Sequence, residues 1–178
     1  LRALSLTSKT YPYKAGLGPF APEVYRVAFN DLDALEFAFK AHVAAEDVAA
    51  IVFEPVQGES GFLVPSQEFV GGMRRLCDEH GIVLVADEVQ TGFCRTGKTF
   101  AIEHFGVEPD LMTIAKSIAA GLPLSGVLGR AEIMDAPGDS AVGWTYVGNP
   151  VAIAAAHAVL DVIAEEGLNE RAQAIGET

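Results

Sequence analysis

Ile82-Val83-Leu84-Val85-Ala86-Asp87-Glu88-Val89-Gln90 runs from five apolar residues directly into two acids. A short run with no polar positions is typical of a strand buried on both faces, as in a parallel sheet. In open α/β sheets, ligands bind just beyond the carboxyl ends of the strands. Asp87 is therefore predicted to stand at a ligand-binding edge.

Two further apolar runs, one before and one after this stretch, are also predicted to be strands. Leu111 to Ala115 is a second apolar strand, and it leads into Lys116. A strand is also expected at Val48 to Phe53, and the helix that follows it starts after Ser66 and ends at Gly81. Strand, helix and strand in this order form a βαβ unit. The sequence thus predicts an α/β fold with a mostly parallel sheet flanked by helices.

The remaining elements are placed by capping residues, apolar periodicity and turn formers. Residues 1–29 are dense in turn formers and are expected to be irregular. Four further elements are predicted: a helix from Asn30 or Asp31, a short helix over Thr99–Phe105, a strand over Ser125–Gly129 and an Ala-rich helix over about Pro150–Glu166.

Composition excludes several functions. The 178 residues carry a formal charge of −12, which disfavours binding to nucleic acid or to an anionic membrane surface. No apolar run approaches the roughly 20 residues of a membrane span, and no signal segment opens the chain. Cys77 and Cys94 are too few for a disulfide framework, and the histidines form no metal-binding pattern. A cytoplasmic protein without a metal is expected.

Lys116 and Asp87 are the residues with the clearest chemical potential. A lysine can form a Schiff base with a carbonyl group, although an ordinary surface lysine fits the position equally well. Asp87 fits either a ligand cation or a structural cap of the next turn. Pyridoxal phosphate would engage both, because it offers an aldehyde to the amine and a ring nitrogen to the acid. Two unit charges about 4 Å apart gain roughly 4 kcal/mol at an effective dielectric of about 20.

Five motifs carry the most specific signal in the chain. In chain order they are Glu54-Pro55-Val56-Gln57-Gly58-Glu59, Ala86-Asp87-Glu88-Val89-Gln90-Thr91-Gly92, Arg95-Thr96-Gly97, Ala115-Lys116-Ser117 and Thr145-Tyr146-Val147-Gly148-Asn149-Pro150. Asp87 and Lys116 lie in two of them, with 28 residues between the two positions. Together these motifs resemble those of the class III pyridoxal-phosphate-dependent aminotransferases of fold type I, and five motifs in this order are far more specific than any one alone. The resemblance is closest to the 4-aminobutyrate subgroup, which the opening stretch Gly18-Pro19-Phe20-Ala21-Pro22-Glu23-Val24-Tyr25-Arg26 supports.

The resemblance implies a role for each matching cofactor residue. Lys116 matches the lysine that forms the Schiff base and carries the proton, and Asp87 matches the partner of the ring nitrogen. Val89 matches the side chain packed on the ring. Gln90 matches the group that hydrogen-bonds the phenolic oxygen of the ring. Thr145 matches the threonine that reaches the cofactor phosphate of the other subunit in a homodimer.

Two acids match substrate-binding positions. Glu59 matches the acid that pairs with a substrate-site arginine, and Glu54 matches a second acid near the substrate. The resemblance thus implies transfer of an amino group from 4-aminobutyrate, or a similar ω-amino acid, to 2-oxoglutarate. Without the resemblance, both glutamates would be interpreted as solvated loop acids.

The resemblance also bears on the extent of the chain, since family members are more than twice as long. Residues 1–178 are expected to be a partial large domain that lacks an amino-terminal segment and a carboxyl-terminal small domain, with apolar sheet faces left uncovered. Two alternatives stay open. One is another class III activity, on ornithine, acetylornithine or diaminobutyrate. The other is a catalytically inert fragment of such an enzyme.

Overall fold

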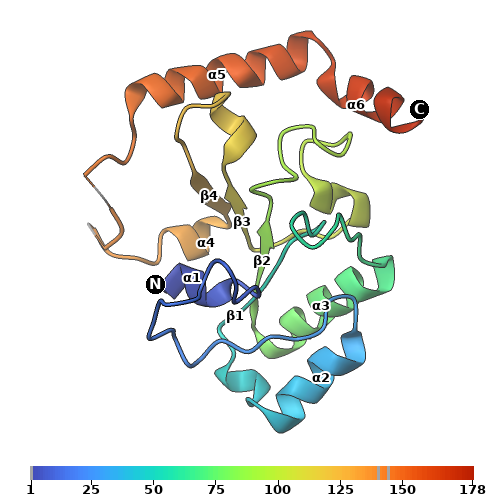
Figure 1. The fold of residues 1–178 in the computed structure, drawn as a ribbon, viewed down its shortest axis with the longest axis vertical. Coiled ribbons are helices and arrows are strands. Elements are labelled where there is room, and N and C mark those ends of the chain that lie inside the picture. The colour runs from blue at the N-terminus through green and yellow to red at the C-terminus, as the bar shows by residue number, and fades with distance from the viewer. Residues whose placement is uncertain (1, 140, 144) are drawn as a thin grey trace. The chain divides into compact units, whose positions relative to one another are not determined.

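A computed structural model describes residues 2–139, 141–143 and 145–178, and Figure 1 shows its elements. The chain divides into two compact units, residues 1–44 and residues 45–178. The sheet and all the candidate site residues belong to the second unit.

The first unit contains α1 (Arg2–Leu6) and α2 (Leu32–Ala41). Asp31 caps α2 as predicted, because its side chain accepts a hydrogen bond from Ala34 N at 2.8 Å. The irregular structure expected for residues 1–29 is wrong at α1. A helix this short gains little from propensity. Tertiary contacts hold it instead: buried Ser5 accepts from Ala21 N at 2.9 Å, and Arg26 donates to the Ser5 carbonyl.

The second unit is built on a four-stranded sheet of described residues. The strands are β1 (Ala50–Phe53), β2 (Val83–Asp87), β3 (Leu111–Ile114) and β4 (Gly126–Gly129), and their spatial order is β1-β2-β3-β4. β1, β2 and β3 run parallel, whereas β4 is antiparallel to β3. The predicted α/β fold with a mostly parallel sheet is confirmed.

The register of the parallel strands brings their carboxyl ends to one edge. Phe53 pairs with Ala86, and Asp87 pairs with Thr113. Lys116 follows Thr113 by three residues. Glu54, Asp87 and Lys116 therefore emerge at the same edge of the sheet, from three adjacent strands.

The helix α3 (Gln67–His80) connects β1 to β2, as predicted. The Ser66 hydroxyl accepts from Phe69 N at 3.1 Å, and Gly81 ends the helix in the left-handed conformation that glycine tolerates, with φ of 68°. The buried face of α3 consists of Phe69, Val70, Gly72, Met73, Leu76 and Cys77.

Shorter helices and a helical pair complete the second unit. The described elements are the 3₁₀ helices η1 (Ala45–Asp47), η2 (Ala101–Phe105) and η3 (Lys116–Ala119) and the α-helices α4 (Ala131–Met134), α5 (Pro150–Glu165) and α6 (Leu168–Gly176). The α5 helix packs against η3, which begins at Lys116. In the part of the chain that the structure describes, no helix is long and apolar enough to cross a membrane.

The outer strands of the sheet expose apolar side chains. Val52 on β1 is 43% exposed, and Val127 and Leu128 on β4 are 48% and 42% exposed.

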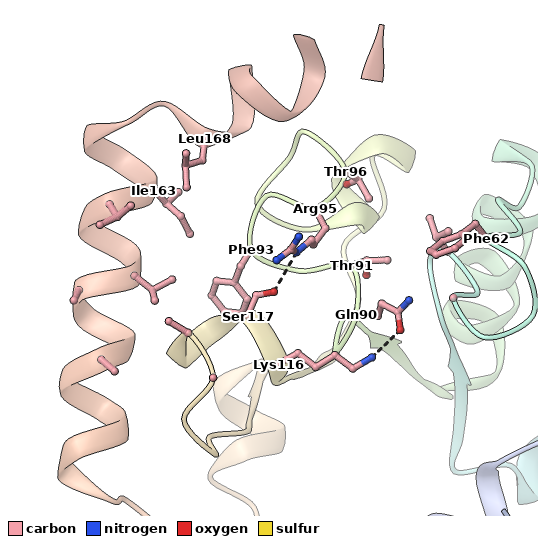
Figure 2. A pocket seen from close by; sticks show the side chains of 18 residues that line it. Phe62, Gln90, Thr91, Phe93, Arg95, Thr96, Lys116, Ser117, Ile163 and Leu168 are labelled. Carbon is pink, nitrogen blue, oxygen red and sulfur yellow. Dashed lines mark hydrogen bonds between the residues drawn. The ribbon is translucent and has the colours of Figure 1, made fainter. Parts of the chain in front are cut away.

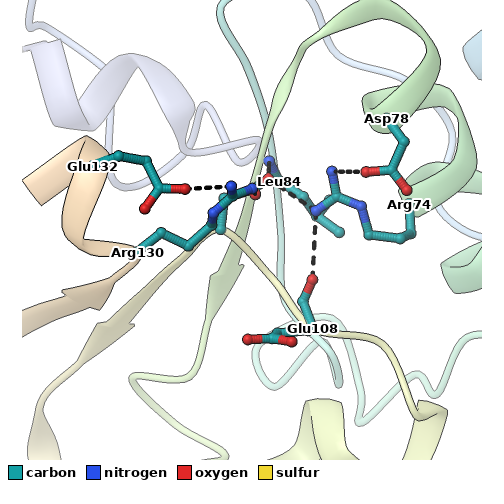
Figure 3. Close-up of polar contacts among 7 residues, drawn as sticks. Arg74, Asp78, Leu84, Glu108, Arg130 and Glu132 are labelled. Atoms are coloured by element: carbon teal, nitrogen blue, oxygen red, sulfur yellow. Dashed lines mark hydrogen bonds and ion pairs between the residues drawn. The ribbon is translucent and has the colours of Figure 1, made fainter.

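An ion network centred on the buried Asp110 fastens the amino end of β2 (Figure 3). The side chain of Asp110 is 7% exposed. Its Oδ2 accepts from Leu84 N and from Arg74 Nη1, both at 2.8 Å, and its Oδ1 accepts from Arg130 Nη1 at 3.0 Å. Burial acts to raise the pKa of Asp110, but the three hydrogen bonds outweigh it and hold the pKa below its ordinary value. The two arginines also pair with the exposed acids Asp78 and Glu132.

Candidate functional site

A cavity of about 1130 Å³ opens at the carboxyl edge of the sheet (Figure 2). It lies wholly within the second unit, between the residues that follow β2, the η3 helix and the inner face of α5. Much of its wall is apolar, and its charged and polar side chains come from only a few positions. The apolar residues include Phe62, Phe93, Val159, Val162, Ile163 and Leu168, and the charged and amide groups are Gln90, Arg95 and Lys116.

Lys116 lines this cavity and points towards Gln90. Its Nζ donates a hydrogen bond to Gln90 Oε1 at 2.7 Å, drawn as a dashed line in Figure 2. Lys116 makes no ion pair with the described residues. The amine is thus oriented by a neutral amide, and its remaining N–H groups stay available to a ligand.

Backbone strain concentrates around the same cavity. Six described non-glycine residues have positive φ, and four of them, Phe62, Phe93, Lys116 and Ala120, line the cavity. Each such residue costs on the order of 1–3 kcal/mol, and strain of this kind clusters at functional sites. The φ of 50° at Lys116 turns the chain sharply out of β3. Most of the strained backbone positions among the described non-glycine residues therefore lie around the cavity that contains Lys116.

Asp87 stands beside the cavity on the neighbouring strand. It is half-buried, and its Oδ1 accepts from the backbone N–H of half-buried Val89 at 3.0 Å. Its Oδ2 accepts no hydrogen bond from any described residue. The turn thus fixes one oxygen of the carboxylate and leaves the other for a cation.

The loop after β1 supports Gln90 from the other side. Glu54 Oε2 accepts from Gly58 N at 3.0 Å, which folds the loop over itself. A Cβ atom at Gly58 would lie 2.3 Å from Gln90 Nε2, so only glycine lets the amide lie so close to this backbone. Glu54 therefore orders a loop that contacts Gln90. Glu59 and Thr145 are exposed and do not line the cavity, and their substrate and phosphate roles stay predictions.

Sequence reasoning gave no role to Glu88 or Arg95. Arg95 Nε donates to Ser117 Oγ at 3.2 Å, which ties the loop after β2 to the residue next to Lys116. Glu88 is fully buried directly after Asp87. A second acid at the end of an apolar strand was the available signal, because a buried acid needs specific partners.

The described residues do not include a group of three histidines, cysteines or acids that could hold a metal ion. Cys77 and Cys94 are both buried free thiols. Burial raises the pKa of Cys77 to about 11. Neither cysteine therefore has the character of a reactive thiolate.

Comparisons with known proteins identify the family of the chain. The family model described as "Aminotransferase class-III" matches residues 1–178. The chain is 56% identical to the probable 4-aminobutyrate aminotransferase of Bacillus subtilis, with 97% of this chain and 44% of that protein covered. It is 51% identical to the 5-aminovalerate aminotransferase DavT of Pseudomonas aeruginosa, over 99% of this chain and 44% of that protein.

Solved structures show the same relationship at the level of the fold. The ornithine aminotransferase of Toxoplasma gondii superposes with a TM-score of 0.90 at 38% identity, over 99% of this chain and 40% of that one. The chain spans less than half the length of each of these relatives. On the family match along its whole length, the chain belongs to the class III aminotransferases.

Proposed function

We propose that this chain carries the cofactor-attachment part of an aminotransferase that moves an amino group from 4-aminobutyrate, or a similar ω-amino acid, to 2-oxoglutarate. The proposed cofactor is pyridoxal phosphate. One observation carries the proposal: Asp87 and Lys116 leave adjacent strands at the same edge, and Lys116 is bonded to Gln90.

The donor set fits pyridoxal phosphate. Lys116 offers a positioned amine, and Asp87 offers a carboxylate oxygen with no hydrogen bond from the described residues. Val89 presents a branched apolar side chain between them in sequence, suited to contact with a flat ring. When bound, this cofactor supplies an aldehyde and an electron-accepting ring. An amine, an acid and an amide at one sheet edge match those functional groups.

Each residue has a defined task in this proposal. Lys116 attaches the cofactor through Nζ and, when released, moves a proton between substrate atoms within reach of its flexible side chain. Asp87 holds a proton at the ring nitrogen by its negative charge. Gln90 orients the Lys116 amine before attachment and is free to bond the phenolic oxygen afterwards.

The roles of the outer residues rest on the resemblance. Thr145 is proposed to donate its hydroxyl to the cofactor phosphate of a second subunit in a homodimer. Glu59 is proposed to pair with a substrate-site arginine, and Glu54 to support the substrate through the loop it folds. Residues 1–178 are proposed to be part of one large domain of a cytoplasmic enzyme.

A second candidate substrate class has its own support. One close structural neighbour is an ornithine aminotransferase, and one close relative is a 5-aminovalerate aminotransferase. All these donors carry a primary amine at the end of a short carbon chain. An amino-donor screen on a complete enzyme containing this chain distinguishes them: we expect fastest turnover with 4-aminobutyrate, and preference for ornithine would favour the second candidate.

Covalent attachment of pyridoxal phosphate can be tested directly on this chain. We expect a yellow protein in excess pyridoxal phosphate, with borohydride fixing the cofactor on Lys116 and not on Lys9, Lys14, Lys40 or Lys98, as mapped by peptide mass spectrometry. A colourless protein with no labelled lysine would favour the inert fragment. Equal labelling of several lysines would contradict a specific site.

A further inference from the structure

Glu88 is the most deeply buried charged residue among those described, with 0% of its surface exposed. It lies between Asp87 and Gln90 in sequence. It does not line the cavity, and the proposed reaction gives it no task. A carboxylate removed from water in this way is costly unless hydrogen bonds compensate it.

Three donors provide that compensation, and all come from nearby parts of the second unit. Ala101 N donates to Glu88 Oε2 at 3.1 Å, and Ile102 N donates to Oε1 at 2.8 Å. The Thr91 hydroxyl makes a short hydrogen bond to the same carboxylate. The carboxylate thus joins the start of η2 to the turn that follows β2.

The backbone of Glu88 is fastened as well. Its N–H donates to the Thr113 carbonyl on β3 at 3.0 Å, and its carbonyl accepts from Gly92 N at 2.9 Å. Through side chain and main chain together, Glu88 fixes both ends of the segment 88–92. Gln90 is at the centre of this segment, and its side chain leaves on the side of Lys116 (Figure 2).

We propose that Glu88 is a positioning residue: its buried carboxylate holds the turn after β2 so that the Gln90 amide meets the Lys116 amine. The proposal rests on the proposed function for its relevance to cofactor attachment, but the geometry it describes exists before any cofactor binds. Glu88 makes no ion pair with a described lysine or arginine. It therefore orders the turn without engaging the Lys116 amine in an ion pair.

The test follows Gln90 and Lys116 directly in the cofactor-free chain. The first readout is the NMR position of the Gln90 side-chain amide. The second is the labelling rate of Lys116 by an amine-reactive reagent, relative to exposed Lys98 in the same sample. Glu88→Gln keeps one acceptor oxygen and replaces the other with an NH₂ group, which faces the N–H of Ala101 or of Ile102 and cannot accept from it. We expect a moved Gln90 resonance and a relative labelling rate raised roughly fivefold, because the bond to Gln90 is lost.

Matched variants separate positioning from general loss of stability. Asp110→Asn alters the other buried carboxylate, at the far end of β2, and should leave both readouts unchanged while it destabilises the chain. Gly58→Ala is the positive control, since its added Cβ would overlap the Gln90 amide. Thr91→Val removes one donor to Glu88, and Thr91→Ser restores it.

Unchanged Gln90 and Lys116 in folded Glu88→Gln would overturn the proposal, as would an equal change in Asp110→Asn. If Glu88→Gln does not fold, the threonine variants decide: the proposal requires a change in Thr91→Val that Thr91→Ser reverses. Failure here leaves the labelling of Lys116 by pyridoxal phosphate intact, whereas failure of the proposed function would abolish that labelling and leave these readouts in place.

Discussion

Two buried carboxylates lie at opposite ends of β2, and they are satisfied in opposite ways. At the amino end, Asp110 accepts from two arginines, Arg74 and Arg130, besides Leu84 N. At the carboxyl end, Glu88 accepts from Thr91 and from the backbone of η2. One acid is paired with cations, and the other is bonded only to neutral dipoles.

The difference shows that stabilising ion pairs and candidate ligand-binding groups lie at opposite ends of β2. A cation that pairs with a buried acid has its charge compensated by that acid, so it is less available to a ligand. At the amino end of β2, Arg74 and Arg130 are both paired with Asp110 in this way. The carboxyl end orders its turn with neutral groups, so Lys116 and one oxygen of Asp87 stay available. Substitutions at the two ends should therefore separate binding from folding.

The largest expected effect is the loss of cofactor attachment in Lys116→Ala. Lys116 is exposed, and its amine bonds only Gln90 among the described residues. We expect no borohydride-fixed pyridoxal phosphate at position 116, and a free energy of unfolding within about 0.5 kcal/mol of the parent chain. Peptide mapping and chemical denaturation measure the two. Lys98→Ala is the matched control and should keep attachment. Retained transamination in Lys116→Ala within a complete enzyme would refute the role of the lysine.

The second effect is on stability at the other end of β2. Asp110→Ala removes the acid that two arginines and Leu84 N share, so it leaves the partly buried Arg74 and the buried Leu84 N–H without this acceptor. Losing a buried acid that holds an ion pair and a buried backbone N–H in this way should cost about 3 kcal/mol. Glu132→Ala is the control, because Glu132 is exposed and its loss should hardly move the denaturation midpoint. A midpoint for Asp110→Ala equal to that of Glu132→Ala would contradict the importance of the network.

Much of the fold and the core of the site follow from local sequence signals. Ser66 and Gly81 define α3 by capping chemistry, and the apolar runs before Asp87 and Lys116 define β2 and β3. For these elements the local signal and the tertiary structure agree. The bond between Lys116 and Gln90 joins two motifs that only the family resemblance assigned to one cofactor, and their cofactor roles stay predictions.

The parts that sequence reasoning missed depend on distant contacts. α1 depends on Arg26 and Ala21, far along the chain, and no local pattern indicates it. Besides the nearby Thr91 hydroxyl, Glu88 bonds the backbone N–H groups of Ala101 and Ile102, which any residue type would provide. Arg95 bonds Ser117 across 22 positions, so its partner could not be chosen from sequence. The predicted roles of Thr145 and Glu59 are not tested by the described contacts.

The third effect compares the two ends through their cysteines. Cys94 lies in the loop after β2 and is 6% exposed, whereas Cys77 lies in α3 and is 1% exposed. A loop opens locally at less cost than a helix packed on the sheet. We expect a thiol reagent at pH 8 to modify Cys94 about tenfold faster than Cys77, a difference of about 1.4 kcal/mol in opening free energy. Mass spectrometry locates the label, and full denaturant should equalise the rates. Faster labelling of Cys77 would show that the amino end opens first.

The smallest effect is a pH dependence that belongs to the amino end. Burial acts to raise the pKa of Asp110, yet its hydrogen bonds hold the folded pKa below that of the unfolded chain. Asp110 therefore contributes stability that is complete above the unfolded value of about 3.9 and is lost as pH falls through the lower, folded value. Denaturation measured from pH 6 to pH 2 should show a shallower acid-induced loss of stability in Asp110→Asn than in the parent chain. The loss is smaller than in Asp110→Ala, because a protonated Asp110 still fills its site and can accept from Leu84 N. Parallel pH curves for the two chains would mean that the ion network does not respond to acid, and the contrast between the two ends of β2 would then rest on geometry alone.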